Sequence, residues 1–239
     1  LKVENFLSLR DVSIELGKLN VFVGPNASGK SNIVKALRLL SIHARGISIL
    51  SLGFREFKEL AYNFDETSTV KISIECGIND SVVEYILELR ADNYRESVFM
   101  RKNNKQITLL SHHGNLFQFD YMSRNMIQKR YSIPSHLRYS FFTYNVSCSA
   151  LNHLPPDAVD ELRKLSDVLR NIRAYSFSPD YIRMASDVSV QPELEYHGEH
   201  LVRVLLHLYL EHRKKFAEIE KILCSLTTYL SLVRLITGL

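Results

Sequence analysis

The sequence predicts an α/β fold in which a strand, a glycine-rich loop and a helix follow one another, with an antiparallel β meander after them. Residues 19–23 are mostly apolar, which is typical of a buried strand. Residues 32–40 carry apolar side chains at helical spacing. The predicted meander strands alternate apolar and polar residues, with turn residues between them, at 70–76, 82–90, 97–101 and 106–110.

The eight residues from Gly24 to Ser31 match G-x-x-x-x-G-K-[ST], the pattern of a phosphate-binding P-loop. Gly24 and Gly29 let the backbone curl, so that consecutive amide groups face phosphate oxygens. The helix that begins near Gly29 adds the positive end of its dipole. Because the match lies between a predicted strand and a predicted helix, the sequence predicts that the chain binds a nucleoside triphosphate.

The residue types of this loop assign roles to its members. Lys30 is a compact cation that can reach the β- and γ-phosphates, and we predict that it is catalytic. The Ser31 hydroxyl is the predicted ligand of Mg²⁺. The expected cofactors are therefore ATP and Mg²⁺. The predicted nucleotide-binding residues are Gly24, Pro25, Asn26, Ala27, Ser28, Gly29, Lys30, Ser31 and Asn32.

The composition fits a folded protein of one or two domains. The chain has 239 residues, of which 46% are hydrophobic, and its net charge of +4 permits a nucleic-acid surface without indicating one. Cys76, Cys148 and Cys224 form no metal or disulfide pattern, which favours a reducing, cytoplasmic setting. Charged residues begin at Lys2 and no apolar stretch is long enough for a bilayer, so neither a secretory signal nor membrane contact is expected.

Three regions are expected along the chain. Residues 1–110 would form a nucleotide-binding lobe with the meander. Residues 111–156 are rich in Ser, Asn, His and Tyr without a clear period, which predicts an irregular insertion. Residues 157–239 would form a helical segment that continues beyond the chain end. Within it the patterns predict helices at about 157–173, 199–212 and 216–230, and a short strand at 175–179.

Two motifs carry a resemblance to a known family. One is Asn5-Phe6 in the first predicted strand, and the other is the sequence Gly-Pro-Asn-Ala-Ser-Gly-Lys-Ser-Asn at 24–32. A Gly-x-x-Leu at 198–201 adds weaker support. The chain resembles the N-terminal half of ABC-type ATPase heads of the RecF, SMC and OLD class, and especially the prokaryotic AAA family ATPases related to OLD proteins. The specific part lies within the first 40 residues.

The resemblance implies an α/β P-loop NTPase fold, built as an ABC-type head with an antiparallel β meander and a partial helical lobe. Two such heads would form a homodimer through the nucleotide face, with ATP held between the P-loop of one and a signature motif of the other. The resemblance also implies ATP hydrolysis in DNA repair or phage defence, which makes DNA a candidate partner.

The sequence departs from that family at three places. Leu7 stands where the family usually has Arg or Lys, and Arg10 is the candidate substitute. The acidic pairs at 65–66 and 160–161 follow no apolar run, so the Walker B carboxylate that would activate water is missing. Residues 50–53 spell the L-S-x-G of the signature motif, but they lie much closer to the P-loop than the family places that motif.

Two explanations account for the missing motifs. The chain begins with Leu1 and ends at Leu239 directly after an apolar run, so we expect a piece of a longer protein whose Walker B and signature motifs lie beyond Leu239. The alternative is a head that binds nucleotide without hydrolysing it, as a regulatory or protein-interaction module. A GTPase or small P-loop kinase is disfavoured because no N-K-x-D guanine motif occurs.

Several other residues have suggestive chemistry. His112 and His113 have no acidic residue or cysteine near them in sequence, which favours a solvated loop pair over metal ligands. Cys148 and Ser149 have no base near them, which argues against a nucleophile. The residue that senses the γ-phosphate in the Q-loop stays open among Gln106, Gln118 and Gln128.

Two further patterns have plain interpretations. The basic residues at 129–130 and 212–215 are interpreted as solvated charges rather than DNA contacts. The helix at 157–173 is too short for a coiled coil and is expected to lie on the domain surface.

Overall fold

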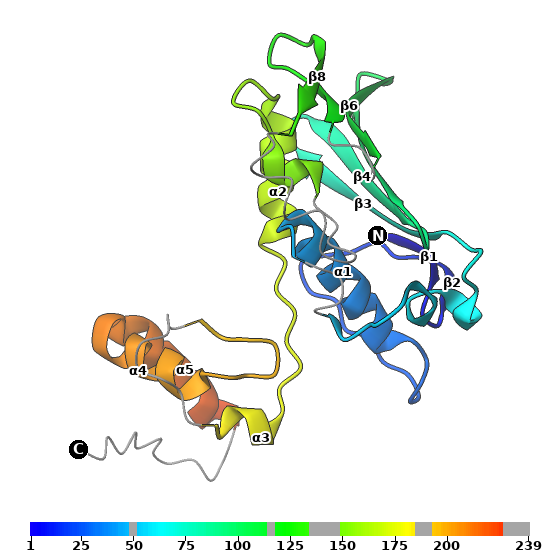
Figure 1. Cartoon of the computed structure of the whole chain (residues 1–239). Coiled ribbons are helices and arrows are strands. Elements are labelled where there is room, and N and C mark those ends of the chain that lie inside the picture. Colours follow the sequence, from blue (N-terminus) through cyan, green and yellow to red (C-terminus); the bar gives the residue numbers. More distant parts are fainter. Residues whose placement is uncertain (48–51, 114–117, 134–148, 185–192, 227–239) are drawn as a thin grey trace. The chain divides into compact units, whose positions relative to one another are not determined.

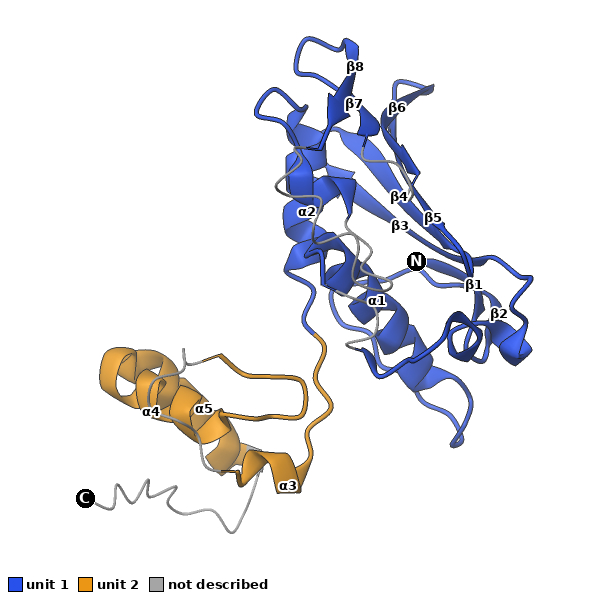
Figure 2. Cartoon of the chain, in the orientation of Figure 1, with its two compact units in different colours: residues 1–173 blue, residues 174–239 orange. Residues whose placement is uncertain are grey.

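The chain folds into two compact units, residues 1–173 (unit 1) and 174–239 (unit 2), which Figure 2 colours separately. Neither expected boundary, after residue 110 or after residue 156, coincides with this one, and the three-part division stays a prediction. The structure is a computed structural model that describes residues 1–47, 52–113, 118–133, 149–184 and 193–226.

Unit 1 is built on an antiparallel sheet with the order β2-β1-β3-β4-β5-β6-β7-β8 among the described residues (Figure 1). From β3 onward each strand pairs with the next one in the chain, so the predicted meander is confirmed. Its strands are β1 (Lys2–Phe6), β2 (Leu9–Ser13), β3 (Val70–Ile78), β4 (Ser81–Leu89), β5 (Tyr94–Lys102), β6 (Lys105–His113), β7 (Gln118–Met122) and β8 (Gln128–Ser132).

Two long helices of unit 1 accompany this sheet, and unit 2 is helical. The α-helices are α1 (Lys30–Ala44), α2 (Asp160–Arg170), α3 (Pro179–Ile182), α4 (Leu201–Glu211) and α5 (Arg213–Leu226). The 3₁₀ turns are η2 (Phe57–Glu59), η3 (Tyr62–Phe64) and η5 (Ala150–His153). Within the described ranges, no helix has both the length and the apolar character needed to cross a bilayer.

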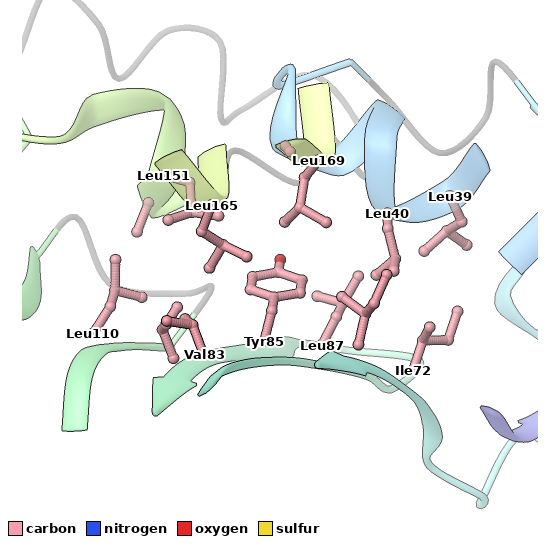
Figure 3. Close-up of a cluster of buried hydrophobic side chains, with 14 of the residues drawn as sticks. Leu39, Leu40, Ile72, Val83, Tyr85, Leu87, Leu110, Leu151, Leu165 and Leu169 are labelled. Atoms are coloured by element: carbon pink, nitrogen blue, oxygen red, sulfur yellow. The ribbon is translucent and has the colours of Figure 1, made fainter. Parts of the chain in front are cut away.

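The core of unit 1 lies between one face of the sheet and the two helices α1 and α2. Figure 3 shows Leu40 of α1 and Leu165 and Leu169 of α2 above Tyr85 and Leu87 of β4. All five side chains are fully buried. Burying a leucine side chain of this size contributes about 1.5–3 kcal/mol. The helix expected on the surface at 157–173 therefore contributes one face, that of Leu162, Leu165 and Leu169, to the core.

The predicted buried strand at residues 19–23 is wrong in this structure. These residues form neither a strand nor a helix, and Leu19, Val21 and Val23 are 85%, 76% and 89% exposed. The physical reason is strand pairing. β1 already has β2 on one side and β3 on the other, and among the described residues no strand pairs with the segment, so its side chains stay exposed.

The predicted irregular insertion at 111–156 is also partly wrong. β7 and β8 continue the meander there. β7 alternates polar and apolar residues but is only five residues long, and β8 is mostly polar. The predicted strand at 175–179 is wrong: residues 175–178 form neither strand nor helix, although Ser176 N donates to Tyr196 O at 2.7 Å, and Pro179 begins α3. The predicted helices near 199–212 and 216–230 are confirmed by α4 and α5 as far as residue 226.

Candidate nucleotide site

The P-loop leads directly into α1, as the sequence predicts. The turn is closed by Ser28 N, which donates to Pro25 O at 3.4 Å. Ala27 (φ 64°) and Gly29 (φ 88°) both adopt left-handed backbone conformations. Residues 24–28 are exposed. Alternating left-handed and right-handed residues turn successive amide groups toward one point, which is the geometry of an anion-binding nest.

Gly29 is the position of this loop that accepts no other residue. A Cβ atom there would lie 3.0 Å from Leu9 Cδ2 and 3.1 Å from Ser8 Oγ, and its φ is unfavourable for any L side chain. Gly29 is also the N-cap of α1. The glycine that the motif requires therefore joins the loop to the β1–β2 turn by close contact.

The first amide groups of α1 are available to an anion. Asn32 N and Ile33 N donate to Gly29 O at 2.9 and 3.3 Å. Gly29, Lys30 and Ser31 donate no backbone hydrogen bond within the described part of the chain, as expected for a helix start. The first turn of α1 holds no acidic residue, so no carboxylate competes for these donors.

The Lys30 side chain folds back over the loop. Its Nζ donates to Gly24 O at 2.8 Å, to Pro25 O at 2.5 Å and to Ser28 Oγ at 3.1 Å. It forms no ion pair with any carboxylate of the described residues. Because a phosphate adds the attraction between opposite charges to the hydrogen bond, it can displace these neutral loop oxygens.

The start of α1 is tied to the first hairpin by side chains. Asn32 Nδ2 donates to Ser8 Oγ at 2.8 Å. Ser8 follows Leu7, which has a left-handed φ of 52°. Arg10, the candidate substitute for the basic residue that the family has at position 7, is exposed on β2. Its role therefore stays a prediction. Ser31, the predicted Mg²⁺ ligand, is exposed beside Lys30.

Neither acidic pair occupies a Walker B position at the end of a buried strand. Asp65 lies in the loop before β3, where its Oδ1 accepts from Thr67 N at 2.9 Å and from Thr67 Oγ1 at 2.7 Å. These bonds lower its pKa. Asp160 and Glu161 form the first turn of α2. Asp65 therefore stabilises its own loop, and Asp160 and Glu161 begin a helix.

The remaining sequence candidates lie apart from the loop or outside the described residues. Gln106, Gln118 and Gln128 are exposed on β6, β7 and β8, at the sheet edge opposite to β2. The first residues of the L-S-x-G sequence at 50–53, and Cys148, lie outside the described residues. The described residues hold no group of three side chains suited to a metal ion.

The basic residues of β8 are engaged in local ion pairs. Lys129 Nζ lies 2.5 Å from Asp157 Oδ2, and Arg130 Nε lies 2.8 Å from Asp120 Oδ1. In the other basic stretch, the Arg213 guanidinium lies 3.8 Å from the centroid of the Tyr209 ring. These contacts agree with the interpretation of the stretches as ordinary surface charges.

A buried carboxylate next to α1 was missed by sequence reasoning. Glu96 of β5 is fully buried. Its Oε1 accepts from Tyr85 Oη at 3.0 Å and from Ser149 Oγ, and its Oε2 accepts from Ala150 N at 2.7 Å. The sequence signal that could have revealed it is the alternation of β5. Tyr94, Glu96 and Val98 lie on the same, inward face of this strand, so Glu96 was placed to be buried.

Two histidine rings complete this buried cluster. His43 Nε2, in the last turn of α1, and His112 Nδ1, on β6, lie 3.8 and 3.6 Å from Glu96 Oε2. Burial alone would raise the pKa of Glu96, but His112 and His43 outweigh burial and hold that pKa below its ordinary value. The interpretation of His112 as a solvated loop residue is therefore wrong, whereas His113 is exposed.

Comparison with known proteins gives two matches. The family described as AAA ATPase domain matches residues 1–221. An OLD nuclease of Thermus scotoductus is 35% identical over 74 residues, which is 31% of this chain and 13% of that relative. The match to this relative thus covers a small part of its length.

Proposed function

Because the chain belongs to the AAA ATPase domain family, we propose that its P-loop binds ATP with Mg²⁺. The resemblance to the AAA family ATPases related to OLD proteins is confirmed by the matches to that family and to the OLD nuclease. The observation that carries the proposal is the loop itself: a left-handed Gly29, three amide groups that donate to no backbone acceptor of the described residues, and a Lys30 cation bound by neutral oxygens.

The residues present fit a triphosphate and its metal ion. The amides of Gly29, Lys30 and Ser31 would hold phosphate oxygens, and Lys30 would pair with the β- and γ-phosphates. The Ser31 hydroxyl would bind Mg²⁺, which neutralises phosphate charge when bound. Pro25, Asn26, Ala27 and Ser28 would supply the bend of the loop, with Gly24 at its start and Asn32 at its end.

We further propose an ABC-type head that acts as a homodimer through its nucleotide face. The exposed apolar side chains of Leu19, Val21 and Val23 support this proposal, since an exposed apolar patch is typical of a surface that another protein surface covers. The head would hydrolyse ATP only with a carboxylate that the described residues do not place at the loop. We propose DNA as a partner because of the similarity to the OLD nuclease. We propose a cytoplasmic location because the few cysteines form no disulfide pattern.

Substitution of Lys30 by alanine tests the proposal. We expect Lys30→Ala to weaken ATP binding by about 10- to 100-fold, because a charge-assisted interaction of about 1.5–3 kcal/mol is lost. Isothermal titration calorimetry with Mg²⁺ and ATP measures the affinity. Lys35→Ala is the matched control, since it removes the same charge from α1 five residues further along without a contact to the loop. Equal ATP affinity in wild type and Lys30→Ala would refute the proposal.

A second candidate function is a nucleotide-binding regulatory or interaction module that does not hydrolyse ATP. The absence of an acidic pair at a strand end among the described residues favours it. We expect the 239-residue chain alone to release phosphate from ATP no faster than its Lys30→Ala variant. A phosphate-release assay on both proteins measures this. Release that depends on Lys30 would exclude the module and establish an ATPase.

A further inference from the structure

A hollow of about 680 Å³ lies beside the P-loop and has no role so far. This volume is within the usual range for small-molecule sites. The hollow is lined by residues of the β1–β2 turn and of the segment around η3: Leu7, Ser8, Glu59, Ala61, Tyr62, Asn63 and Phe64. Two aromatic residues, Tyr62 and Phe64, and three polar ones, Ser8, Glu59 and Asn63, therefore line one open space.

The two walls of this hollow are fixed to each other by the backbone. Leu7 N donates to Leu60 O at 2.7 Å, and Phe6 and Ala61 form an isolated β-bridge. Leu60 and Ala61 are buried. The segment that carries η3 is thus held against the end of β1, and the hollow between them is a built feature of the fold.

Phe64 has an unusual conformation at this site. Asn63 (φ 54°) and Phe64 (φ 59°) are two consecutive left-handed residues, which is costly for a bulky side chain. The Phe64 ring is 72% exposed, although aromatic rings are normally at least partly covered. A strained backbone that presents an aromatic ring to solvent points to a ring that packs against a ligand.

The hollow adjoins the P-loop through Ser8. Ser8 lines the hollow, and its Oγ accepts from Asn32 Nδ2 of the loop motif at 2.8 Å. The same Oγ would lie 3.1 Å from a Cβ at Gly29. A nucleotide whose phosphates occupy the loop therefore has this hollow next to it, on the side of the first hairpin.

We propose that the hollow binds the nucleobase of the nucleoside triphosphate, with the Phe64 ring stacked on the base. This inference rests on the proposed function, since the P-loop must hold the phosphates. Stacking on an aromatic ring suits any base. The amide of Asn63 adds a donor and an acceptor for the polar edge of the base. Glu59 is committed to structure, because its Oε2 accepts from Arg55 N at 2.7 Å.

The first test compares ATP with inorganic tripolyphosphate, which lacks a base. We expect Phe64→Ala to weaken ATP binding by about 5- to 100-fold, the range measured for base stacking, and to leave tripolyphosphate binding unchanged. Calorimetry in the presence of Mg²⁺ measures both. Met126→Ala is the matched control, since Met126 is also left-handed (φ 57°) and 47% exposed, but lies between β7 and β8 at the other edge of the sheet.

The second test uses fluorescence. The chain has no tryptophan, so Phe64→Trp introduces a single reporter at the hollow. We expect ATP to quench its emission and tripolyphosphate to leave it unchanged. Wild-type ATP affinity in Phe64→Ala, or an emission that ATP does not alter, would overturn the nucleobase site alone. If the wild type binds neither ATP nor tripolyphosphate, the proposed function fails as well.

Discussion

Replacement of Glu96 by alanine is expected to lower the free energy of unfolding by about 3–5 kcal/mol, the cost of removing one partner from a buried, hydrogen-bonded charged group. Glu96 binds three donors, from Tyr85, Ser149 and Ala150, and two of these precede or begin η5. Loss of the carboxylate leaves these buried donors unpaired. Chemical denaturation measures the change.

Two control variants separate charge from hydrogen bonding. Glu96→Gln keeps an acceptor for Tyr85 and Ser149 but removes the charge, so its cost is expected to lie below that of Glu96→Ala. Glu84→Ala removes a carboxylate from the opposite face of neighbouring β4 and is expected to cost no more than about 0.5 kcal/mol. A Glu96→Ala variant as stable as Glu84→Ala would mean that the cluster contributes nothing to the fold.

The same cluster gives the protein an acid-sensitive stability. The pKa of Glu96 is lower in the folded protein than in the unfolded chain, where an ordinary glutamate has a pKa of about 4.3. Its contribution is therefore complete above that ordinary value and is lost as the pH falls through the lower folded pKa. Denaturation curves collected from neutral pH downward should show a weaker acid dependence for Glu96→Gln than for the wild type.

The features that local patterns determine were predictable from the sequence. The P-loop requires Gly29 and a helix start, and both signals lie within a few residues of each other. The turns of the meander were equally local: Asn79, Asn103 and Asn104 adopt the left-handed conformations that their residue type favours. Each of these predictions depended on neighbours in sequence, and the structure confirms them.

The features that depend on distant partners were not predictable. Glu96 meets His43 and Ser149 only after the meander, α1 and η5 have come together, and no spacing in the sequence relates these residues. The role of Phe64 likewise depends on the bridge between Phe6 and Ala61. Residues 19–23 show the converse: their apolar pattern is real, but strand formation needs a partner that the pattern cannot specify.

Two alanine substitutions, one of a core residue and one in segment 19–23, test this last point directly. Leu40→Ala is expected to lower the free energy of unfolding by about 2–5 kcal/mol, because it leaves a cavity where α1 packs over the sheet (Figure 3). Val23→Ala is expected to change it by no more than about 0.5 kcal/mol, because Val23 is 89% exposed. Urea denaturation, with equal m-values for both variants, measures the two effects.

Comparing the stabilities of these two variants shows which segments hold the P-loop in place. If Val23→Ala proves as costly as Leu40→Ala, residues 19–23 pack as a buried strand, and the loop is held from both ends. With the expected result, residues 19–23 give the loop no support, and α1 and the first hairpin hold it. Nucleotide affinity should then be insensitive to Val23→Ala until a second strand covers the segment, and dependent on the packing of α1 throughout.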